Sequence, residues 1–267
     1  YCFRRPRNRS LAVIEGEVRD ALAYGKKIGL MGAAISDYPE IDALCRSILG
    51  EGLSMSVASF RADSVTKELV ESLAASGLKT LTIAPEAGSA RMRAVINKGI
   101  EEHHLFTSVD LGAAAHILNF KLYIMVGLPF EMDEDIDAII DLTQRLRSYM
   151  DEKGCRGTLT LSVNPFVPKP FTPFQWMAAA EKKRMDAVMK QLTQALSRHK
   201  KIVVHFESPK EARVQSILAR GDRRLSLPLM RAAAGRGAKD LVPEMRDAGL
   251  SPDDYLTREW AEDEMLP

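Results

Sequence analysis

The stretch TLTIAPEAGSARMRAVINKG, residues 80–99, is the part of the sequence that decides the fold. The apolar run from Leu78 to Ala84 predicts a short buried strand, and Pro85 is expected to break its ladder of backbone hydrogen bonds. Gly88-Ser89 is expected to open a helix, whose first N–H groups lack a partner within the helix and can receive an anionic or polar ligand. We therefore expect Glu86 and Gly88-Ser89 to form a cofactor-facing loop at the carboxyl end of a strand.

The same order of strand, loop and helix recurs on both sides of this stretch. Further strands are expected at residues 27–31, 53–58, 120–126 and 158–163, and helices at 9–24, from a cap at Ser36 or Asp37 to Leu49, at 65–75 and at 136–150. Strands separated by helices require right-handed parallel crossovers. None of these units contains a glycine-rich dinucleotide fingerprint or a Walker loop. The pattern favours an α/β fold, with a complete or partial (β/α) parallel barrel, over a doubly wound sheet.

The pattern changes after Trp176. A charged helix is expected at residues 178–198 and one further strand in KKIVVHFES, residues 200–208. Short helices are then expected at 209–219, 225–234, 241–248 and 252–261, separated by turns that contain Gly or Pro. We therefore predict a domain boundary near Pro209, with a barrel over 1–208 and a mainly helical extension over 209–267.

Composition narrows the class of protein. The chain has 267 residues, of which 46% are apolar, enough for a substantial core. Its 37 basic and 36 acidic residues give a net charge of +1, so no bulk attraction to nucleic acid is expected, and the Arg-rich patches do not establish an RNA substrate. Three cysteines, an odd number, indicate a reducing cytoplasm rather than a disulfide framework. No apolar run is long enough for a membrane span and no signal peptide is evident.

In a parallel barrel, the chemistry gathers at the carboxyl ends of the strands. The residues expected to share that rim are Gly32, Ala33, Ala34, Ser59, Arg61, Glu86, Ser89, Gly127, Pro129 and Asn164. Most of them are small or polar, as the rim of a ligand pocket requires.

Several motifs together resemble a radical SAM enzyme. Tyr1-Cys2 looks like the end of the family's CxxxCxΦC motif, and residues 32–34, GAA, follow the first expected strand where the family usually has GGE. APEAGSARMRAVINKG (84–99) resembles the fourth-strand motif of the methylthiotransferase and coproporphyrinogen-dehydrogenase branch. YIMVGLPFEMDED resembles the fifth-strand GxP loop. SVNPFVPKPFTPFQW and SPKEARVQSILARGDRR narrow the likeness to bacterial iron–sulfur oxidoreductases that are often fused to a cobalamin-binding-like domain.

This resemblance implies a cofactor role for each matched position. Cys2 would be one of three thiolates that hold a [4Fe–4S] cluster, which implies a chain truncated within the motif, without its first strand and part of the cluster loop. Gly32, Ala33 and Ala34 would face the methionine amino group, although the Glu of GGE is absent. Ser59 and Arg61 would face the ribose or methionine part of S-adenosylmethionine. Glu86 would reach the ribose, Gly127 and Pro129 would line the adenine pocket through the backbone, and Ser89 and Asn164 share that rim.

The basic partner in the fourth-strand motif is left open by the sequence. Arg91, Arg93 and Lys98 compete for contact with the cofactor carboxylate. Glu86 could instead be a turn carboxylate paired with Arg91 or Arg93. Cys45 and Cys155 are interpreted as structural or incidental thiols. No catalytic residue is identified from the sequence.

The resemblance implies an oxidoreductase-like reaction, of which it gives only the first half. S-adenosylmethionine would be cleaved reductively to methionine and a 5′-deoxyadenosyl radical that takes a hydrogen atom from an unknown substrate. An electron donor such as flavodoxin or ferredoxin, and cobalamin in an upstream domain, would accompany it, whereas the truncated chain itself is expected to be inactive. The rival hypothesis is a non-catalytic barrel that serves as a docking module of a multidomain protein. An ordinary phosphate-binding barrel is disfavoured, because NPFVPKPFTPFQW is too rich in proline for a phosphate loop.

Overall fold

A computed structural model describes residues 7–32 and 34–261, and all its paired strands are parallel. One sheet has two strands, β1 (Lys27–Gly29) and β2 (Ser54–Ser56). The other has four, in the order β3 (Thr80–Glu86), β4 (Asn119–Val126), β5 (Leu159–Pro165) and β6 (Ile202–Phe206). A parallel bridge between Phe60 and Ile83 connects the segment after β2 to β3. The strands therefore follow one another in space as they do in the sequence.

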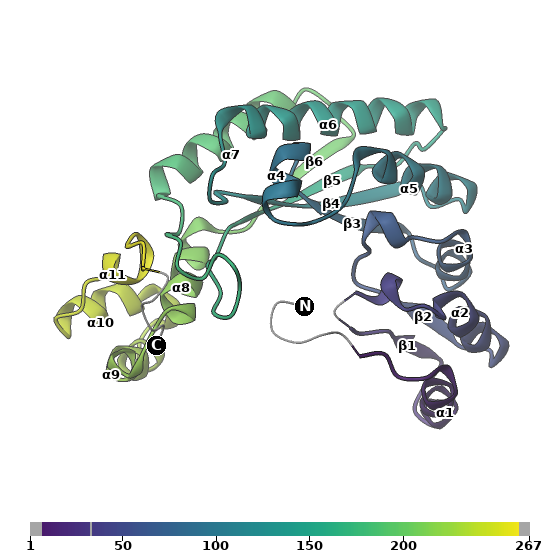
Figure 1. The fold of residues 1–267 in the computed structure, drawn as a ribbon, viewed down its shortest axis with the longest axis horizontal. Helices are drawn as coiled ribbons and strands as arrows, with labels where there is room; N and C mark the ends of the chain where they lie inside the picture. Colours follow the sequence, from purple (N-terminus) through teal and green to yellow (C-terminus); the bar gives the residue numbers. More distant parts are fainter. Residues whose placement is uncertain (1–6, 33, 262–267) are drawn as a thin grey trace.

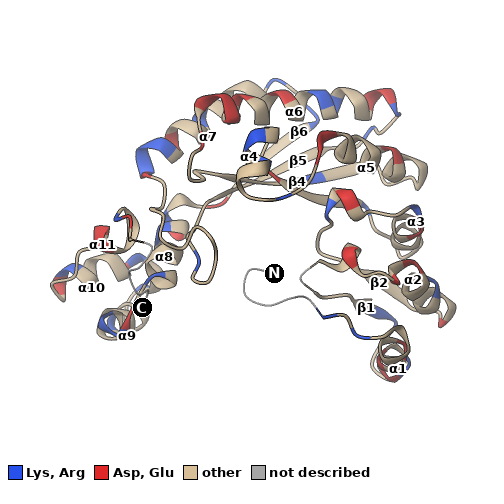
Figure 2. Ribbon diagram, viewed as in Figure 1, with Lys and Arg blue, Asp and Glu red and all other residues tan. Residues whose placement is uncertain are grey.

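Helices cover the outer side of this curved array, while the inner side is left open (Figure 1). The covering helices are α1 (Leu11–Ala21), α2 (Ile41–Gly50), α3 (Lys67–Ala75), α5 (Glu102–Ala114), α6 (Asp133–Glu152) and α7 (Lys182–Leu196). A short helix, α4 (Ala90–Val95), follows β3, and two 3₁₀ turns lie at Ile35–Asp37 and Ala62–Ser64. Charged residues gather on the helices, and the strands carry few (Figure 2). The expected α/β fold with parallel strands is confirmed, and its arched form is that of a partial barrel.

The strands alternate between a buried and a partly exposed face. The buried face packs against the helices and is formed by Leu81, Ile83, Phe120, Leu122, Ile124, Val126, Leu159, Leu161 and Val163. Each such side chain contributes roughly 1.5–3 kcal/mol when it is fully buried. The inner face carries Thr80, Thr82, Ala84, Lys121, Tyr123, Met125, Thr160, Ser162 and Asn164. A closed barrel is filled by bulky branched apolar side chains, whereas most of the side chains on this face are polar, as in a face that takes a ligand.

Several local expectations are wrong. Pro85 interrupts the ladder as expected, since the register with β4 shifts between Ile83 and Glu86, but β3 does not end at Ala84 and continues to Glu86. Ser36 and Asp37 do not cap α2, which begins at Ile41 after Glu40. The helix expected at 252–261 is only α11, Asp253–Leu256.

The segment after β6 forms four helices around an apolar cluster of its own. They are α8 (Pro209–Ala219), α9 (Ser226–Ala234), α10 (Leu241–Asp247) and α11, and α8 has the predicted bounds. Backbone hydrogen bonds join this segment to the chain before α7, from Ala179 N to Leu256 O (2.8 Å) and from Trp260 N to Trp176 O (3.0 Å). The boundary near Pro209 stays a prediction. Within residues 7–32 and 34–261, no helix combines the length and apolarity that a membrane crossing requires.

Candidate functional site

The carboxyl ends of the strands meet at one edge of the array. Glu86 at the end of β3 is in register with Ile124 of β4, and Met125 is in register with Asn164 of β5. Gly127 follows β4 directly. The predicted convergence of Glu86, Gly127 and Asn164 is therefore found. Of the other predicted residues, Gly32 and Ala34 follow β1, Ser59 and Arg61 follow β2, and Pro129 follows β4, whereas Cys2 and Ala33 lie outside the described residues.

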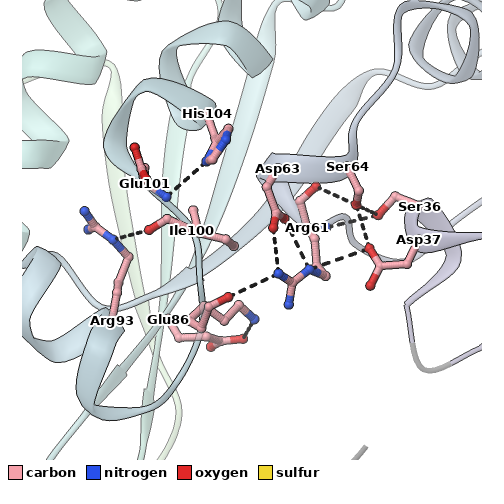
Figure 3. A network of polar contacts seen from close by, with 11 residues as sticks. Ser36, Asp37, Arg61, Asp63, Ser64, Glu86, Arg93, Ile100, Glu101 and His104 are labelled. Atoms are coloured by element: carbon pink, nitrogen blue, oxygen red, sulfur yellow. Dashed lines mark hydrogen bonds and ion pairs between the residues drawn. The ribbon is translucent and has the colours of Figure 1, made fainter. Parts of the chain in front are cut away.

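Arg61 connects the loops that follow β1, β2 and α4 (Figure 3). Its guanidinium donates to Asp63 Oδ2 (2.6 Å) and to the backbone carbonyl of Lys98 (3.2 Å), and lies 3.6 Å from Asp37 Oδ1. Ser64 Oγ donates to Asp37 Oδ1 at 2.7 Å and lies 2.8 Å from Ser36 Oγ. Ser36 and Asp37 thus tie the first loop to the second.

Glu86 and Lys98 form an ion pair at the edge, with Nζ 3.1 Å from Oε1 (Figure 3). Their side chains are 22% and 19% exposed, so the pair is largely sheltered yet reachable. Glu86 has a φ of 67°, a left-handed conformation that is unusual for a residue with a side chain and that turns the chain sharply after β3. The alternative pairing of Glu86 with Arg91 or Arg93 is wrong.

Arg93 holds the loop between Glu86 and Ile100 in place. Its guanidinium is buried, and it donates to the carbonyls of Ile100 (2.8 Å), Gly88 (2.8 Å) and Ala87 (3.2 Å). Burial lowers the pKa of this guanidinium, but an arginine remains charged in proteins. Arg93 therefore fixes the path of the chain between β3 and Ile100, and Lys98 is the cation of this motif that reaches Glu86.

Ser89 and Arg91 both bond to Asp135 in the first turn of α6. Ser89 Oγ donates to Asp135 Oδ1 at 2.6 Å and also caps α4 by accepting from Met92 N at 3.0 Å, while Arg91 pairs with Asp135 Oδ2. Burial of the Asp135 carboxyl acts to raise its pKa, but the hydrogen bonds from Arg91 and Ser89 hold that pKa below its usual range. The cofactor roles of Ser89 and Arg91 stay predictions.

Gly88 brings the loop close to α6. A Cβ at this position would lie 2.4 Å from the backbone nitrogen of Ile139 and 2.5 Å from its Cα. Only a glycine allows that approach without a shift of the helix.

The loop after β4 is held together by a hydrogen bond between its first backbone N–H group and the carboxylate of Glu131. Gly127 N donates to Glu131 Oε2 at 2.8 Å, and Gly127 has a φ of 75°. Burial raises the pKa of Glu131 to about 7, against the opposing effect of the Gly127 hydrogen bond. Pro129 stands between these two residues, so the GxP loop is held in one conformation.

Asn164 differs from the other residues of the edge. Its Oδ1 atom is buried and has no hydrogen-bond partner within the described chain. Buried polar atoms are normally bonded, and an unpartnered one calls for an explanation such as a ligand.

A cavity of about 730 Å³ opens beside β1 and reaches Gly32 and Ala34. Its other walls come from residues 7–9, from α1 and the start of α2, and from β1 with the loop that follows it, and they include none of Glu86, Gly127 and Asn164. It therefore lies beside the first loop and apart from Glu86, Gly127 and Asn164.

Cys45 and Cys155 are not suited to metal binding. Both thiols are buried, and burial raises the pKa of Cys45 to about 11 and also raises the pKa of Cys155. A thiol with a raised pKa is a poor ligand, because the thiolate is the binding form. In the part of the chain that is described, no three His, Cys, Asp or Glu side chains gather into a metal-binding group.

A model of the radical SAM superfamily matches residues 1–143. The chain belongs to the radical SAM superfamily. It is 37% identical over 202 residues to the uncharacterized protein MJ0966 of Methanocaldococcus jannaschii, in an alignment that covers 75% of this chain and 42% of that protein. The chain thus spans less than half the length of this relative.

Two solved structures that align with this chain are those of TsrM and SuiB. TsrM, a radical S-adenosylmethionine methyltransferase from Kitasatospora setae with cobalamin and a [4Fe-4S] cluster bound, aligns with a TM-score of 0.56 at 13% identity, over 90% of this chain and 56% of TsrM. SuiB of Streptococcus suis, bound to S-adenosylmethionine, aligns with a TM-score of 0.47 at 14% identity, over 77% of this chain and 45% of SuiB. The likeness to TsrM shows a shared fold.

Sequence reasoning missed the functions of Asp135 and Glu131. Asp135 receives two side chains from a loop more than forty positions earlier in the chain, and no local pattern reveals such a partner. The signal for Glu131 is its place four residues after Gly127, within reach of the free backbone N–H of the loop.

Proposed function

We propose that this radical SAM chain binds S-adenosylmethionine along the carboxyl edge of its sheet and takes part in its reductive cleavage. The observation that carries the proposal is the buried Oδ1 of Asn164, on the strand next to the Gly127 loop, which has no hydrogen-bond partner among residues 7–32 and 34–261. A buried acceptor without a partner costs about 1–3 kcal/mol. A ligand that donates a hydrogen bond there removes that cost.

The residues present fit the polar groups of S-adenosylmethionine. Its ribose hydroxyls can donate to the Glu86 carboxylate, which Lys98 holds in position at 3.1 Å. Its amino group or adenine amine can donate to Asn164 Oδ1. The Lys98 ammonium has three N–H donors, so it can serve the ligand carboxylate as well as Glu86.

The loops supply orientation and exclusion of water. The bonds of Arg61 and Arg93 fix the loops on one side of Glu86, and the bond of Glu131 to Gly127 fixes the loop on the other. When bound, S-adenosylmethionine and a reduced iron–sulfur cluster supply one-electron radical chemistry. The chain's own contribution is to bind and orient the cofactor and to keep water from it.

The cluster itself is assigned only one ligand here. We propose Cys2 as that ligand on the strength of the family motif, because the described cysteines, Cys45 and Cys155, are buried and apart from the edge. The proposal extends to a reducing cytoplasm and to an electron donor such as flavodoxin or ferredoxin, which family membership supports.

Binding of S-adenosylmethionine to the complete protein, measured by equilibrium dialysis, tests the proposal. Glu86→Gln should weaken binding about tenfold, because it removes the charged acceptor while keeping its shape. Glu152→Gln, an exposed residue at the end of α6, is the matched control and should bind as the wild type does. Unchanged affinity in Glu86→Gln would remove Glu86 from the site, and a wild type that does not bind the cofactor would favour the docking module.

A further inference from the structure

The inner face of the four-stranded sheet carries a charge without a counter-charge. Strands β3 to β6 contain two Lys, Arg, Asp or Glu residues, Glu86 and Lys121. Glu86 is paired with Lys98, whereas no described carboxylate forms an ion pair with Lys121. Lys121 is partly buried, so its side chain lies along the sheet rather than fully in solvent. A lysine ammonium without a carboxylate partner can offer its charge to an anionic ligand.

The direction of the Lys121 side chain is defined. Its Nζ lies 4.9 Å from the centroid of the Tyr123 ring, a cation–π contact. Tyr123 is two residues nearer the carboxyl end of β4, so the contact directs the ammonium along the inner face toward the edge with Glu86 and Asn164. Its N–H groups donate to no group of the described chain, which leaves them for a ligand.

Hydrogen-bonding groups from three strands lie at the same level. Tyr123 is in register with Ser162 of β5, and Ser162 is in register with His205 of β6. Residues in register on neighbouring parallel strands have side chains on the same face, with the strands about 4.8 Å apart. The residues in register with Lys121 on the two neighbouring strands are Thr82 of β3 and Thr160 of β5. Both have short side chains, which leaves room for a ligand beside the lysine.

We propose that this inner-face cluster, Lys121, Tyr123, Ser162 and His205, binds an anionic group of the substrate, a carboxylate or a phosphate. The ammonium supplies a positive charge, and the phenol, hydroxyl and imidazole supply hydrogen bonds. The identification of the ligand as the substrate rests on the proposed function, because the cluster lies on the face below the predicted cofactor edge. The existence of the anion site does not depend on it.

Anion titrations followed by NMR of the 267-residue chain, labelled with ¹³Cε-lysine, test the inference. Inorganic phosphate and glutarate are added separately at constant ionic strength, so that general screening does not change. The Lys121 resonance, assigned by its loss in Lys121→Arg, should shift saturably with at least one of the two anions. The anion that does so distinguishes a phosphate from a carboxylate group.

The variants decide whether Lys121 is responsible. Lys121→Met should bind the effective anion about tenfold more weakly, and Lys121→Arg should retain most of the affinity, with backbone amide resonances reporting binding in both. Lys190→Met removes the same charge from an exposed position on α7 and should leave the affinity unchanged. The inference is overturned if neither anion gives a saturable shift, or if Lys121→Met binds as tightly as the wild type.

A parallel measurement separates this inference from the proposed function. S-adenosylmethionine affinity of the complete protein should be the same in Lys121→Met as in the wild type. A wild-type protein that binds the anion but not S-adenosylmethionine would contradict the proposed function alone. A wild-type protein that binds S-adenosylmethionine but neither anion would contradict the anion site alone.

Discussion

Two parts of the strand array, called here the closed half and the open half, differ in how their polar groups are satisfied; the first lies along the carboxyl edge and the second on the inner face of β4, β5 and β6. In the closed half, residues 34–37, 59–64 and 86–100, the charged side chains bond mainly to other parts of the chain, as Arg61 and Arg93 do. In the open half, the inner-face residues of β4, β5 and β6, the Oδ1 of Asn164 and the ammonium of Lys121 have no hydrogen-bond or ion-pair partner within the described chain. The difference separates a scaffold that is already assembled from groups that remain available to ligands.

The closed half needs this dense bonding because its loops are irregular. Between Glu86 and Ile100 only six residues are helical, so regular backbone hydrogen bonds cannot fix the path. Arg93 replaces them by binding three carbonyls. The result is that Glu86 and Lys98 are held together before any ligand arrives.

The largest effect is expected from a change that disrupts the closed half. Gly88→Ala would put a Cβ 2.4 Å from the backbone of α6, and backbone atoms cannot move aside as a side chain can. We expect a loss of about 3 kcal/mol in the free energy of unfolding, measured by urea denaturation.

Gly16→Ala is the control for this substitution, because a Cβ at Gly16 on α1 meets nothing within 4 Å. It should raise the free energy of unfolding by about 0.5–1 kcal/mol through helix propensity. Equal stability of the two variants would mean that the loop is free to move away from α6, and the closed half would then be less rigid than its contacts indicate.

A smaller effect is expected at Glu131, in the loop between the two halves. Burial raises its pKa to about 7, against about 4.3 in an unfolded chain. The folded state keeps a proton that the unfolded state has lost between these values, so this group lowers stability as the pH rises from about 4.5 to about 7. Glu131→Gln should remove that dependence and be up to about 3 kcal/mol more stable than the wild type at pH 8, with little difference at pH 4.

Urea denaturation at several pH values measures this dependence. Glu134→Gln, an exposed carboxylate in the first turn of α6, should retain the dependence of the wild type. If the Glu131→Gln and wild-type curves run parallel from pH 4 to pH 8, the carboxyl is not protonated in the folded loop at neutral pH.

The closed half was predictable where the signal is local. Gly88-Ser89 and the apolar run before it predict a strand, a turn and a helix, and Ser89 caps α4 as expected. The choice of Lys98 as the partner of Glu86 was not predictable, because three cations follow Glu86 within twelve positions. Only the path that Arg93 imposes on the loop selects among them.

Other failures have a similar physical origin. The sequence indicates a helix start near His103-His104 but not the extent of α5, Glu102–Ala114, because small residues interrupt the apolar stripe by which a helix is found in a sequence. Oδ1 of Asn164 is left without a partner in the described chain because neither β4 nor β6, the strands beside β5, offers it a donor, and such an absence has no signature in a sequence. Strands, turns and helix caps are therefore predictable from the sequence here. Which polar groups find a hydrogen-bond partner can be seen only in the folded structure.

The smallest expected change in stability is also the one that tests the open half most directly. Asn164→Leu replaces a buried oxygen that has no partner in the described part of the chain with an apolar group of similar size. Removal of an unsatisfied acceptor should leave the free energy of unfolding unchanged or raise it by up to about 1 kcal/mol. Affinity for S-adenosylmethionine in the complete protein should nevertheless fall about tenfold, because the ligand loses an acceptor.

Asn119→Leu, the same substitution at the other end of the sheet, gives the contrast. Asn119 Oδ1 accepts from Thr158 N at 2.9 Å and its Nδ2 donates to Lys79 O at 3.1 Å, so both backbone groups would lose a partner. That variant should lose about 2 kcal/mol of stability and bind the cofactor as the wild type does. Asn164→Leu should therefore keep its stability and lose affinity, whereas Asn119→Leu should lose stability and keep its affinity. If Asn164→Leu is instead destabilised as much as Asn119→Leu, Asn164 has a partner in the folded chain and the open half does not reserve it for a ligand.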